Sequence, residues 1–143
     1  MPDSFSKSAQ IVCEFGFESS HQLMRPEWTA EQNAAVFGKC VRLHGHSYRL
    51  VVTLRGLIDP QTGMVINFTE VKARVREQVI QPLDHHHLND ILDEMPTAEN
   101  IAWWIGERLI NAFEGVELTR VELWETRTSG AVLEKDDLAR LIR

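Results

Sequence analysis

The sequence lacks a surplus of positive charge and has no long apolar run. Its 143 residues include 15 Lys and Arg against 21 Asp and Glu, which gives a formal net charge of −6. A general nucleic-acid binder would carry a basic face, so this class is not expected, although a local basic pocket for a small anionic substrate is compatible with the composition. No stretch approaches the roughly 20 apolar residues that span a bilayer, so no membrane association is expected.

Cysteine is also scarce, with Cys13 and Cys40 the only two. Two cysteines cannot supply a structural zinc site built from three or four thiolates. They could form one disulfide, but a domain of this size buries a core without one. The first residues lack a charged start followed by an apolar run, so no secretory signal is expected, and the sequence predicts reduced thiols in the cytoplasm.

Two catalytic motifs are absent as well. The sequence has no G-x-G-x-x-G fingerprint, so no motif indicates a bound nicotinamide or flavin. It also has no H-E-x-x-H, which excludes a protease of the zincin type. A catalytic metal would therefore have to be held by another arrangement of ligands.

Alternation of apolar and polar residues predicts four strands in a single domain, residues 1–143, with a frayed polar tail at residues 1–9. The second strand has the clearest pattern, because alternate apolar residues share one face and its β-branched residues suit a sheet. The predicted strands cover residues 10–18, 46–56, 117–125 and 130–134.

Helix signals fall between the second and third predicted strands. Thr69 is expected to cap a helix over about residues 70–80 that ends at Pro82, and Thr97 is expected to cap a second helix. A shorter helix is expected around residues 30–36, and the C-terminal tail adds a helical turn. This order favours an α+β fold, with an antiparallel sheet and the helices on one face. The other face then needs a cover, for which another subunit is the natural candidate.

Three histidines have the spacing of a metal site. His44 and His46 stand at positions i and i+2 where a strand begins, so both side chains point to one face, with backbones about 6.6 Å apart. His21 follows the first strand and reaches the same point if the two strands pair. Three neutral imidazoles suit zinc and leave a fourth position open, which is typical of a catalytic site. Ordinary surface histidines are the alternative, and the third histidine and a nearby thiol weigh against it.

That thiol belongs to Cys40, four residues before His44. Lys39 and Arg42 lie close to it in the sequence, and neighbouring cations favour the thiolate, which could act as a general base. The alternative is an inert, small apolar side chain. That is the role expected for Cys13, which lies on the apolar face of a predicted strand.

A second cluster of histidines follows the helix that Pro82 ends. In the run Asp84-His85-His86-His87, an aspartate beside a histidine can fix the tautomer of the imidazole, so Asp84 and His85 form a candidate proton-transfer pair. Glu125 ends a predicted strand, where its carboxylate could accept two hydrogen bonds from a guanidine-like heterocycle. An exposed strand end is the alternative for Glu125.

Taken together, these segments resemble the family of 6-pyruvoyl-tetrahydropterin and 6-carboxy-tetrahydropterin synthases. The resemblance runs from about Phe15 to Leu133, nearly the whole chain. Each motif alone is of modest specificity, and the set is very specific. The motifs are FESSHQL, FGKCVRLHGHSY, IDPQTGMVINFTEVK, PLDHHHLND, PTAEN and WETRTSG.

The resemblance implies a fold, an assembly and a set of site residues. The fold is the tunnelling fold (T-fold), a four-stranded antiparallel sheet with two helices on one side. Its subunits typically form trimers that close a β-barrel and stack as hexamers. By motif, the zinc ligands correspond to His21, His44 and His46, the catalytic cysteine to Cys40, its partner pair to Asp84 and His85, the pterin-anchoring glutamate to Glu125, and a threonine of the pterin pocket to Thr97.

The motifs divide between two branches of the family. The C-x3-H-G-H spacing from Cys40 to His46 resembles the carboxy branch, which feeds queuosine and deazapurine synthesis. Residues 37–40 and 64–67 resemble the pyruvoyl branch more closely, whereas Ala98 stands where that branch tends to have a second threonine. We give the loop spacing most weight, because it sets where the thiolate lies relative to the metal.

The expected activity is therefore that of a zinc-dependent carbon–carbon lyase. It would convert 7,8-dihydroneopterin triphosphate to 6-carboxy-5,6,7,8-tetrahydropterin and release acetaldehyde and triphosphate. The first alternative is a 6-pyruvoyl-tetrahydropterin synthase, which eliminates triphosphate only. A relative that binds zinc or pterin without catalysis, or one that resembles a pterin aldolase, is the second.

Overall fold

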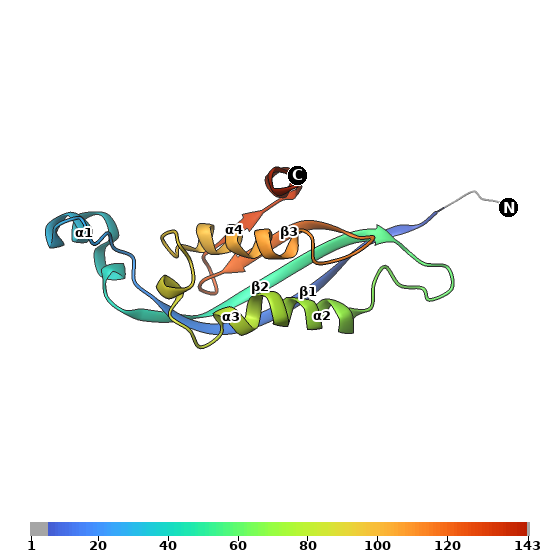
Figure 1. Ribbon diagram of the computed structural model, residues 1–143, viewed down its shortest axis with the longest axis horizontal. Helices are drawn as coiled ribbons and strands as arrows, with labels where there is room; N and C mark the ends of the chain where they lie inside the picture. Colours follow the sequence, from blue (N-terminus) through green and yellow to red (C-terminus); the bar gives the residue numbers. More distant parts are fainter. Residues whose placement is uncertain (1–5, 143) are drawn as a thin grey trace.

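The computed structural model describes residues 6–142, in which four strands form one antiparallel sheet in the order β1-β2-β3-β4 (Figure 1). The first two strands pair along their whole length, from Ser8 opposite Leu57 to His21 opposite His44. The strands are β1 (Ser8–His21), β2 (His44–Leu57), β3 (Glu117–Trp124) and β4 (Gly130–Leu133). The four predicted strands and their antiparallel arrangement are confirmed.

Strands β1 and β2 are longer than predicted, at 14 residues each. The apolar alternation stops at Glu18, but backbone pairing with β2 carries the strand on to His21. At the other end, Ser8 and Ala9 already belong to β1, so the predicted frayed tail is wrong for these two residues. Ser6 and Lys7 are exposed and precede the strand, and residues 1–5 lie outside the described residues.

The helices between β2 and β3 begin with α2 (Phe68–Val75), two residues earlier than predicted. Its N-cap is Asn67, whose side chain accepts a hydrogen bond of 2.8 Å from the backbone N–H of Thr69, so the prediction of Thr69 as the cap is wrong. The helix continues through a π turn into α3 (Gln81–Leu83), which places Pro82 inside the last turn. An amide side chain at the cap satisfies the same free N–H groups as a hydroxyl would.

The remaining predicted helices are confirmed. Thr97 caps α4 (Ala98–Leu109), accepting a hydrogen bond of 3.2 Å from the backbone N–H of Asn100. The short helix α1 (Ala30–Phe37) lies beyond the end of the sheet at which β1 ends and β2 begins (Figure 1). Helix α5 (Lys135–Leu138) follows β4. Within residues 6–142, no helix is long and apolar enough to cross a membrane.

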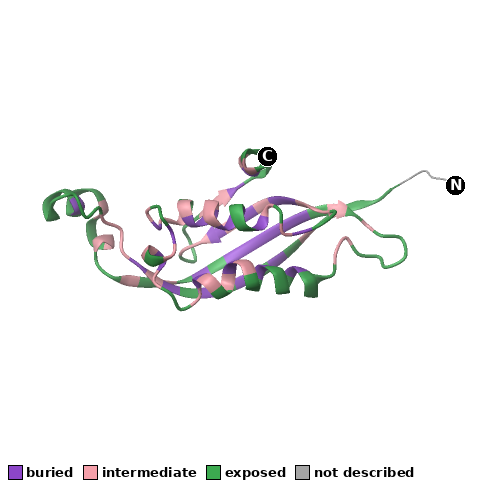
Figure 2. Ribbon diagram, in the orientation of Figure 1, coloured by how far each residue is buried: buried purple, intermediate pink, exposed green. Residues whose placement is uncertain are grey.

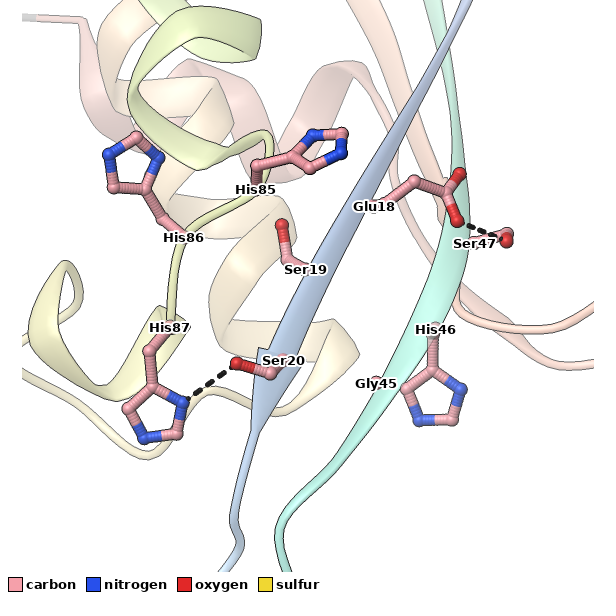
Figure 3. A pocket seen from close by; sticks show the side chains of 9 residues that line it. All are labelled: Glu18, Ser19, Ser20, Gly45, His46, Ser47, His85, His86 and His87. Atoms are coloured by element: carbon pink, nitrogen blue, oxygen red, sulfur yellow. Dashed lines mark hydrogen bonds between the residues drawn. The ribbon is translucent and has the colours of Figure 1, made fainter.

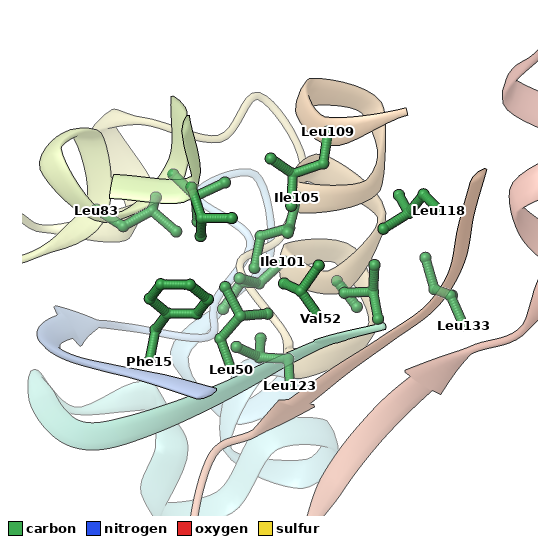
Figure 4. Close-up of a cluster of buried hydrophobic side chains, with 14 of the residues drawn as sticks. Phe15, Leu50, Val52, Leu83, Ile101, Ile105, Leu109, Leu118, Leu123 and Leu133 are labelled. Carbon is green, nitrogen blue, oxygen red and sulfur yellow. The ribbon is translucent and has the colours of Figure 1, made fainter. Parts of the chain in front are cut away.

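Helices α2, α3 and α4 cover one face of the sheet, and the core lies between the two layers (Figures 2 and 4). Odd-numbered residues of β1 and even-numbered residues of β2 point into this core, as the alternation predicts. Fully burying one large aliphatic side chain contributes about 1.5–3 kcal/mol. The helices contribute the predicted stripes, which include Val71, Val75, Val79, Ile101, Ile105 and Leu109, all buried.

The opposite face of the sheet carries no helix and is mostly polar in its exposed part. Arg49 on β2 forms an ion pair of 2.9 Å with Glu14 on β1, and Ser47 donates to Glu18 at 2.5 Å. Val12 is 54% exposed on this face. The histidines of β1 and β2 lie on the face that the helices cover, at the end of the sheet where those helices stop.

Candidate metal centre and active site

Pairing of β1 with β2 brings the three predicted histidines together. His21 is directly opposite His44, and His46 lies two residues further along β2 on the same face. One ring nitrogen from each residue lies within 4.8 Å of the other two, a group that could hold a metal ion. The ring centroids are 4.5–5.1 Å apart. The predicted convergence of three imidazoles is confirmed.

Backbone carbonyls set the tautomers of two of these rings. The Nδ1 of His21 lies 2.8 Å from the carbonyl oxygen of Pro96, and that of His44 lies 2.6 Å from the carbonyl oxygen of Arg42. Because a carbonyl oxygen can only accept, each Nδ1 carries the hydrogen and each Nε2 keeps a free lone pair. Outer hydrogen bonds of this kind orient metal-ligating histidines in general.

His21 has the clearest features of a metal ligand. It is fully buried, and its Nε2 has no hydrogen-bond partner among the described residues. Burial lowers the pKa of His21, and burial likewise lowers the pKa of His46. Both rings are therefore held in the neutral form, which is the form that binds metals. Three converging imidazoles, one of them with a buried free nitrogen, fit a zinc ion.

Tyr48 forms the floor of this cluster on the side of the core. Its ring stacks on Phe17 with centroids 4.9 Å apart and makes edge contacts with His21 and His46. Burial raises the pKa of Tyr48, and the nearby Glu125 carboxylate raises it further, so the phenol stays neutral. On the core side, the histidine cluster thus packs against buried aromatic rings. Tyr48 was missed as a site residue, although its position two residues after His46 on the same strand face was visible in the sequence.

Glu125 reaches the cluster from the hairpin between β3 and β4. Its backbone N–H donates to the carbonyl oxygen of Ser129 at 2.9 Å, which anchors the start of the turn. The carboxylate oxygen Oε1 lies 3.8 Å from Nε2 of both His21 and His46. The structure therefore brings this predicted substrate-binding residue to the histidines, and does not leave it on an exposed strand end.

The predicted pair Asp84 and His85 follows α3, and Figure 3 shows His85 beside the edge of β1. Asp84 Oδ2 is 3.0 Å from His85 Nδ1, and its Oδ1 accepts a 2.9 Å hydrogen bond from the backbone N–H of Glu18. His85 has a φ of 60°, a left-handed conformation that is costly outside glycine. Its N–H donates to the carbonyl oxygen of Glu18 at 2.6 Å, which helps to hold that conformation.

An open hollow of about 480 Å³ lies between His46 and the loop of the second histidine cluster, and His21 and His44 do not line it (Figure 3). His46 lines it from β2, and His85 lines it from the loop after α3. Ser20 was missed by sequence reasoning: its hydroxyl lies 3.0 Å from Nδ1 of His87, and both residues line the hollow. The full lining consists of Glu18, Ser19, Ser20, Gly45, His46, Ser47, His85, His86 and His87.

The two cysteines differ as predicted in their surroundings. Cys13 is buried in the core, where burial raises its thiol pKa. Cys40 is half-buried in the 3-10 turn Gly38–Val41, and its backbone carbonyl accepts a 2.9 Å hydrogen bond from the N–H of Leu23. It does not line the hollow that contains His85. Within the described part of one chain, the structure thus does not bring Cys40 to its predicted partner.

Pro96 connects His21 to the start of α4. Its carbonyl oxygen accepts the hydrogen bond from Nδ1 of His21, and the next residue, Thr97, is the N-cap of the helix. Replacing Thr97 with alanine is expected to lower the free energy of unfolding by about 1 kcal/mol. It should also weaken metal binding, since the loosened cap carries the Pro96 carbonyl. Thermal melts and metal competition would measure both effects. Thr29→Ala, at the cap of the distant α1, should lower stability alone, and equal metal affinities in the two variants would contradict the link.

Asp84 should make the stability of the fold depend on pH. The Glu18 N–H, followed by the hydrogen bond to His85, lowers the pKa of Asp84 below its ordinary value. A lowered carboxyl pKa stabilises the fold above the unfolded pKa of about 3.9 and loses that effect as pH falls through the folded pKa. We expect Asp84→Asn to unfold at lower denaturant than wild type at pH 7, with the difference shrinking below about pH 4. A constant difference across this range would show that the carboxylate charge is not the cause.

The chain is similar to known proteins that all belong to one family. The family model for 6-pyruvoyl tetrahydropterin synthase matches residues 10–136. A 6-carboxy-5,6,7,8-tetrahydropterin synthase from Synechocystis sp. is 44% identical over 127 residues, covering 85% of this chain and 89% of that protein. The human 6-pyruvoyl tetrahydrobiopterin synthase is 39% identical over 124 residues, covering 82% and 86%. A dihydroneopterin monophosphate aldolase from Pyrococcus furiosus is 37% identical over 127 residues, covering 88% and 97%.

The fold agrees with these sequence matches. The 6-pyruvoyl tetrahydropterin synthase of Caenorhabditis elegans superimposes with a TM-score of 0.81 at 26% sequence identity, covering 92% of this chain and 99% of that one. The predicted tunnelling fold of a single subunit is thereby confirmed. With a family model matching nearly the whole described sheet and its helices, the chain belongs to the 6-pyruvoyl tetrahydropterin synthase family, whose named relatives process pterins.

Proposed function

We propose that this protein is a zinc-dependent lyase that converts 7,8-dihydroneopterin triphosphate to 6-carboxy-5,6,7,8-tetrahydropterin, acetaldehyde and triphosphate. The observation that carries the proposal is the buried, unpartnered Nε2 of His21 at the centre of three converging imidazoles. It supports a catalytic metal site in a chain whose relatives act on pterins. The cytoplasm is the predicted location of the protein.

In this proposal His21, His44 and His46 would hold the zinc, and the bound ion would supply Lewis-acid polarisation of the hydroxyl groups of the substrate side chain. Glu125 accepts hydrogen bonds from the guanidine-like edge of the pterin ring. Thr97, which follows Pro96, would border the pterin ring in this proposal.

Proton transfer falls to the remaining predicted residues. The Cys40 thiolate removes a proton from the substrate side chain, and the His85 imidazole moves a second proton. Asp84 accepts a hydrogen bond from the Nδ1 of His85, so the Nε2 of that ring is directed away from the loop and stays available. The ring is reduced by internal tautomerisation, which requires no nicotinamide or flavin.

The carboxy product is favoured over the pyruvoyl product by two observations. The C-x3-H-G-H spacing from Cys40 resembles the carboxy branch, and a relative of that name is 44% identical. The pyruvoyl reaction is the second candidate, because the human relative at 39% identity carries that name. In the carboxy reaction the side-chain carbon–carbon bond breaks and acetaldehyde leaves with triphosphate. In the pyruvoyl reaction only triphosphate leaves, and a diketone side chain remains.

The product analysis follows directly from this difference. Metal-loaded protein would be incubated with 7,8-dihydroneopterin triphosphate, and the pterins and acetaldehyde identified by mass. Acetaldehyde equimolar with 6-carboxy-tetrahydropterin supports the proposal. A 6-pyruvoyl product without acetaldehyde would establish the alternative reaction. Pterin binding with no product would mark a non-catalytic relative, and selective cleavage of the monophosphate would point to an aldolase like that of Pyrococcus furiosus.

We also propose a trimer-based assembly, as a trimer or a hexamer, with active sites at subunit interfaces. A sheet with a helix-free face and two outer strands supports it, and so does the absence of Cys40 from the hollow that contains His85. Sedimentation at micromolar protein concentration should therefore give a mass of three or six chains. A clean monomer with full activity would be incompatible with shared sites.

A further inference from the structure

Glu125 faces the histidine cluster at a distance that a hydrogen bond does not explain. Its Oε1 lies 3.8 Å from Nε2 of His21 and 3.8 Å from Nε2 of His46, beyond normal hydrogen-bond length. The Nε2 of His21 bears a lone pair and no hydrogen, because Nδ1 donates to Pro96. Two electron-rich atoms therefore face each other across this gap, an arrangement that a cation between them would stabilise.

The distances are close to those between two ligands of one metal ion. In a tetrahedral zinc site with bonds of about 2.0–2.1 Å, neighbouring donor atoms lie about 3.3 Å apart. Closing the remaining gap needs a shift of roughly 0.5 Å, well within the reach of a glutamate side chain. Together with the three imidazoles, whose ligand nitrogens lie within 4.8 Å of one another and would also draw in around the ion, the carboxylate would make a set of four ligands.

The turn allows the carboxylate of Glu125 to move, because only the backbone of this residue is hydrogen-bonded. The N–H donates to Ser129, whereas the carboxylate receives no hydrogen bond within residues 6–142. The side chain is 27% exposed, so it borders both the buried histidines and the solvent from which a substrate arrives. One carboxylate can thus turn toward the histidines or toward a ligand above them.

We infer that Glu125 is a fourth, displaceable metal ligand in the substrate-free protein, an inference that rests on the proposed zinc site. When a pterin binds, its paired N–H donors take the carboxylate away from the metal. The coordination position opens only in the presence of the substrate that will use it. The same residue thereby links recognition of the ring to access of the side-chain hydroxyls.

Cobalt(II) in place of zinc makes this coordination visible, because the ligand set determines its absorption bands in the visible range. The proteins compared would be wild type, Glu125→Gln and, as a control, Glu117→Gln at the far end of β3, where the carboxylate pairs with Lys135. Cobalt affinity would be measured by competition with a chelator. Neopterin, which lacks the triphosphate, would serve as the pterin probe.

We expect Glu125→Gln to bind cobalt at least about 10-fold more weakly and to show a changed visible spectrum. Neopterin should change the wild-type spectrum, because it removes the carboxylate, and Glu117→Gln should behave as wild type. The spectrum decides the matter, since a carboxylate that acts only by its charge would alter affinity and leave the bands unchanged.

Two results would overturn the inference, and they are distinguishable from failure of the metal site itself. Identical spectra for wild type and Glu125→Gln, both with stoichiometric cobalt, would leave the three-histidine site standing without a fourth glutamate ligand. A thiolate-to-cobalt charge-transfer band that is lost in Cys40→Ala would assign the fourth position to Cys40. If wild type bound no cobalt, the proposed function would fail together with the inference.

Discussion

Cys40→Ala should reduce kcat by about 10²–10⁴-fold, the usual cost of removing a general base. Cys40 lies in the turn before β2, four residues from His44, so its thiol can face the side chain of a substrate without being a required ligand of the metal. Zinc content and pterin affinity should therefore remain those of wild type. Steady-state kinetics, metal analysis and pterin titration would together measure the three quantities.

The matched control for this experiment is Cys13→Ala. Cys13 is 5% exposed in the core and lies on β1, so its removal should cost some stability and little activity. If Cys40→Ala lost its zinc, the thiolate would be a fourth ligand and the site would be closed and structural. That outcome would contradict both the role of Cys40 and the enzyme proposal.

His44→Ala should abolish stoichiometric zinc binding and, with it, turnover. Without His44 the ion keeps only two imidazoles and, at most, the displaceable Glu125 carboxylate, a set too weak to retain zinc against a chelator. The Nδ1 of His44 is hydrogen-bonded to the carbonyl oxygen of Arg42, which aims its Nε2 at the cluster. Metal analysis after gel filtration in the presence of a weak chelator is the direct measurement.

His86 provides the comparison for this variant. It is an exposed histidine of the second cluster, and its Nδ1 is hydrogen-bonded to the carbonyl oxygen of Asp84. His86→Ala should keep one zinc per chain. Full zinc occupancy in His44→Ala would show that the ligand assignment is wrong, whereas loss of zinc in both variants would point to general instability of this end of the sheet.

Sequence reasoning predicted the sheet and the histidine cluster well, because both depend on local periodicity. A strand places residues i and i+2 on one face, so the convergence of His44 and His46 follows from β2 alone. The ends of β1 were underestimated because Ser19 and Ser20 are polar, and only pairing with β2 shows that the strand continues. The cap of α2 was misplaced because Asn67 and Thr69 both have side chains that suit a helix start.

The supporting contacts could not be predicted, because they join residues far apart in the chain. The bond from His21 to Pro96 spans 75 positions, and no periodic pattern contains it. The proximity of Glu125 to His21 and His46 likewise depends on the pairing of β3 with β2. Motif resemblance named Glu125 as a site residue, but its direction toward the metal cluster is visible only in three dimensions.

The loop after α3 has a further consequence for the outer edge of β1. It occupies the backbone groups of Glu18 through Asp84 and His85, and the N–H of Ser20 through the carbonyl of His86. Among the described residues, no backbone hydrogen bond of this kind reaches the edge from Gln10 to Gly16. Any strand that adds there, from a second copy or from an aggregating chain, meets a physical stop before the histidines. If the added strand slipped by one residue, each of its side chains would point to the wrong face of the sheet. The loop after α3 would therefore fix the register of a strand that pairs with this edge.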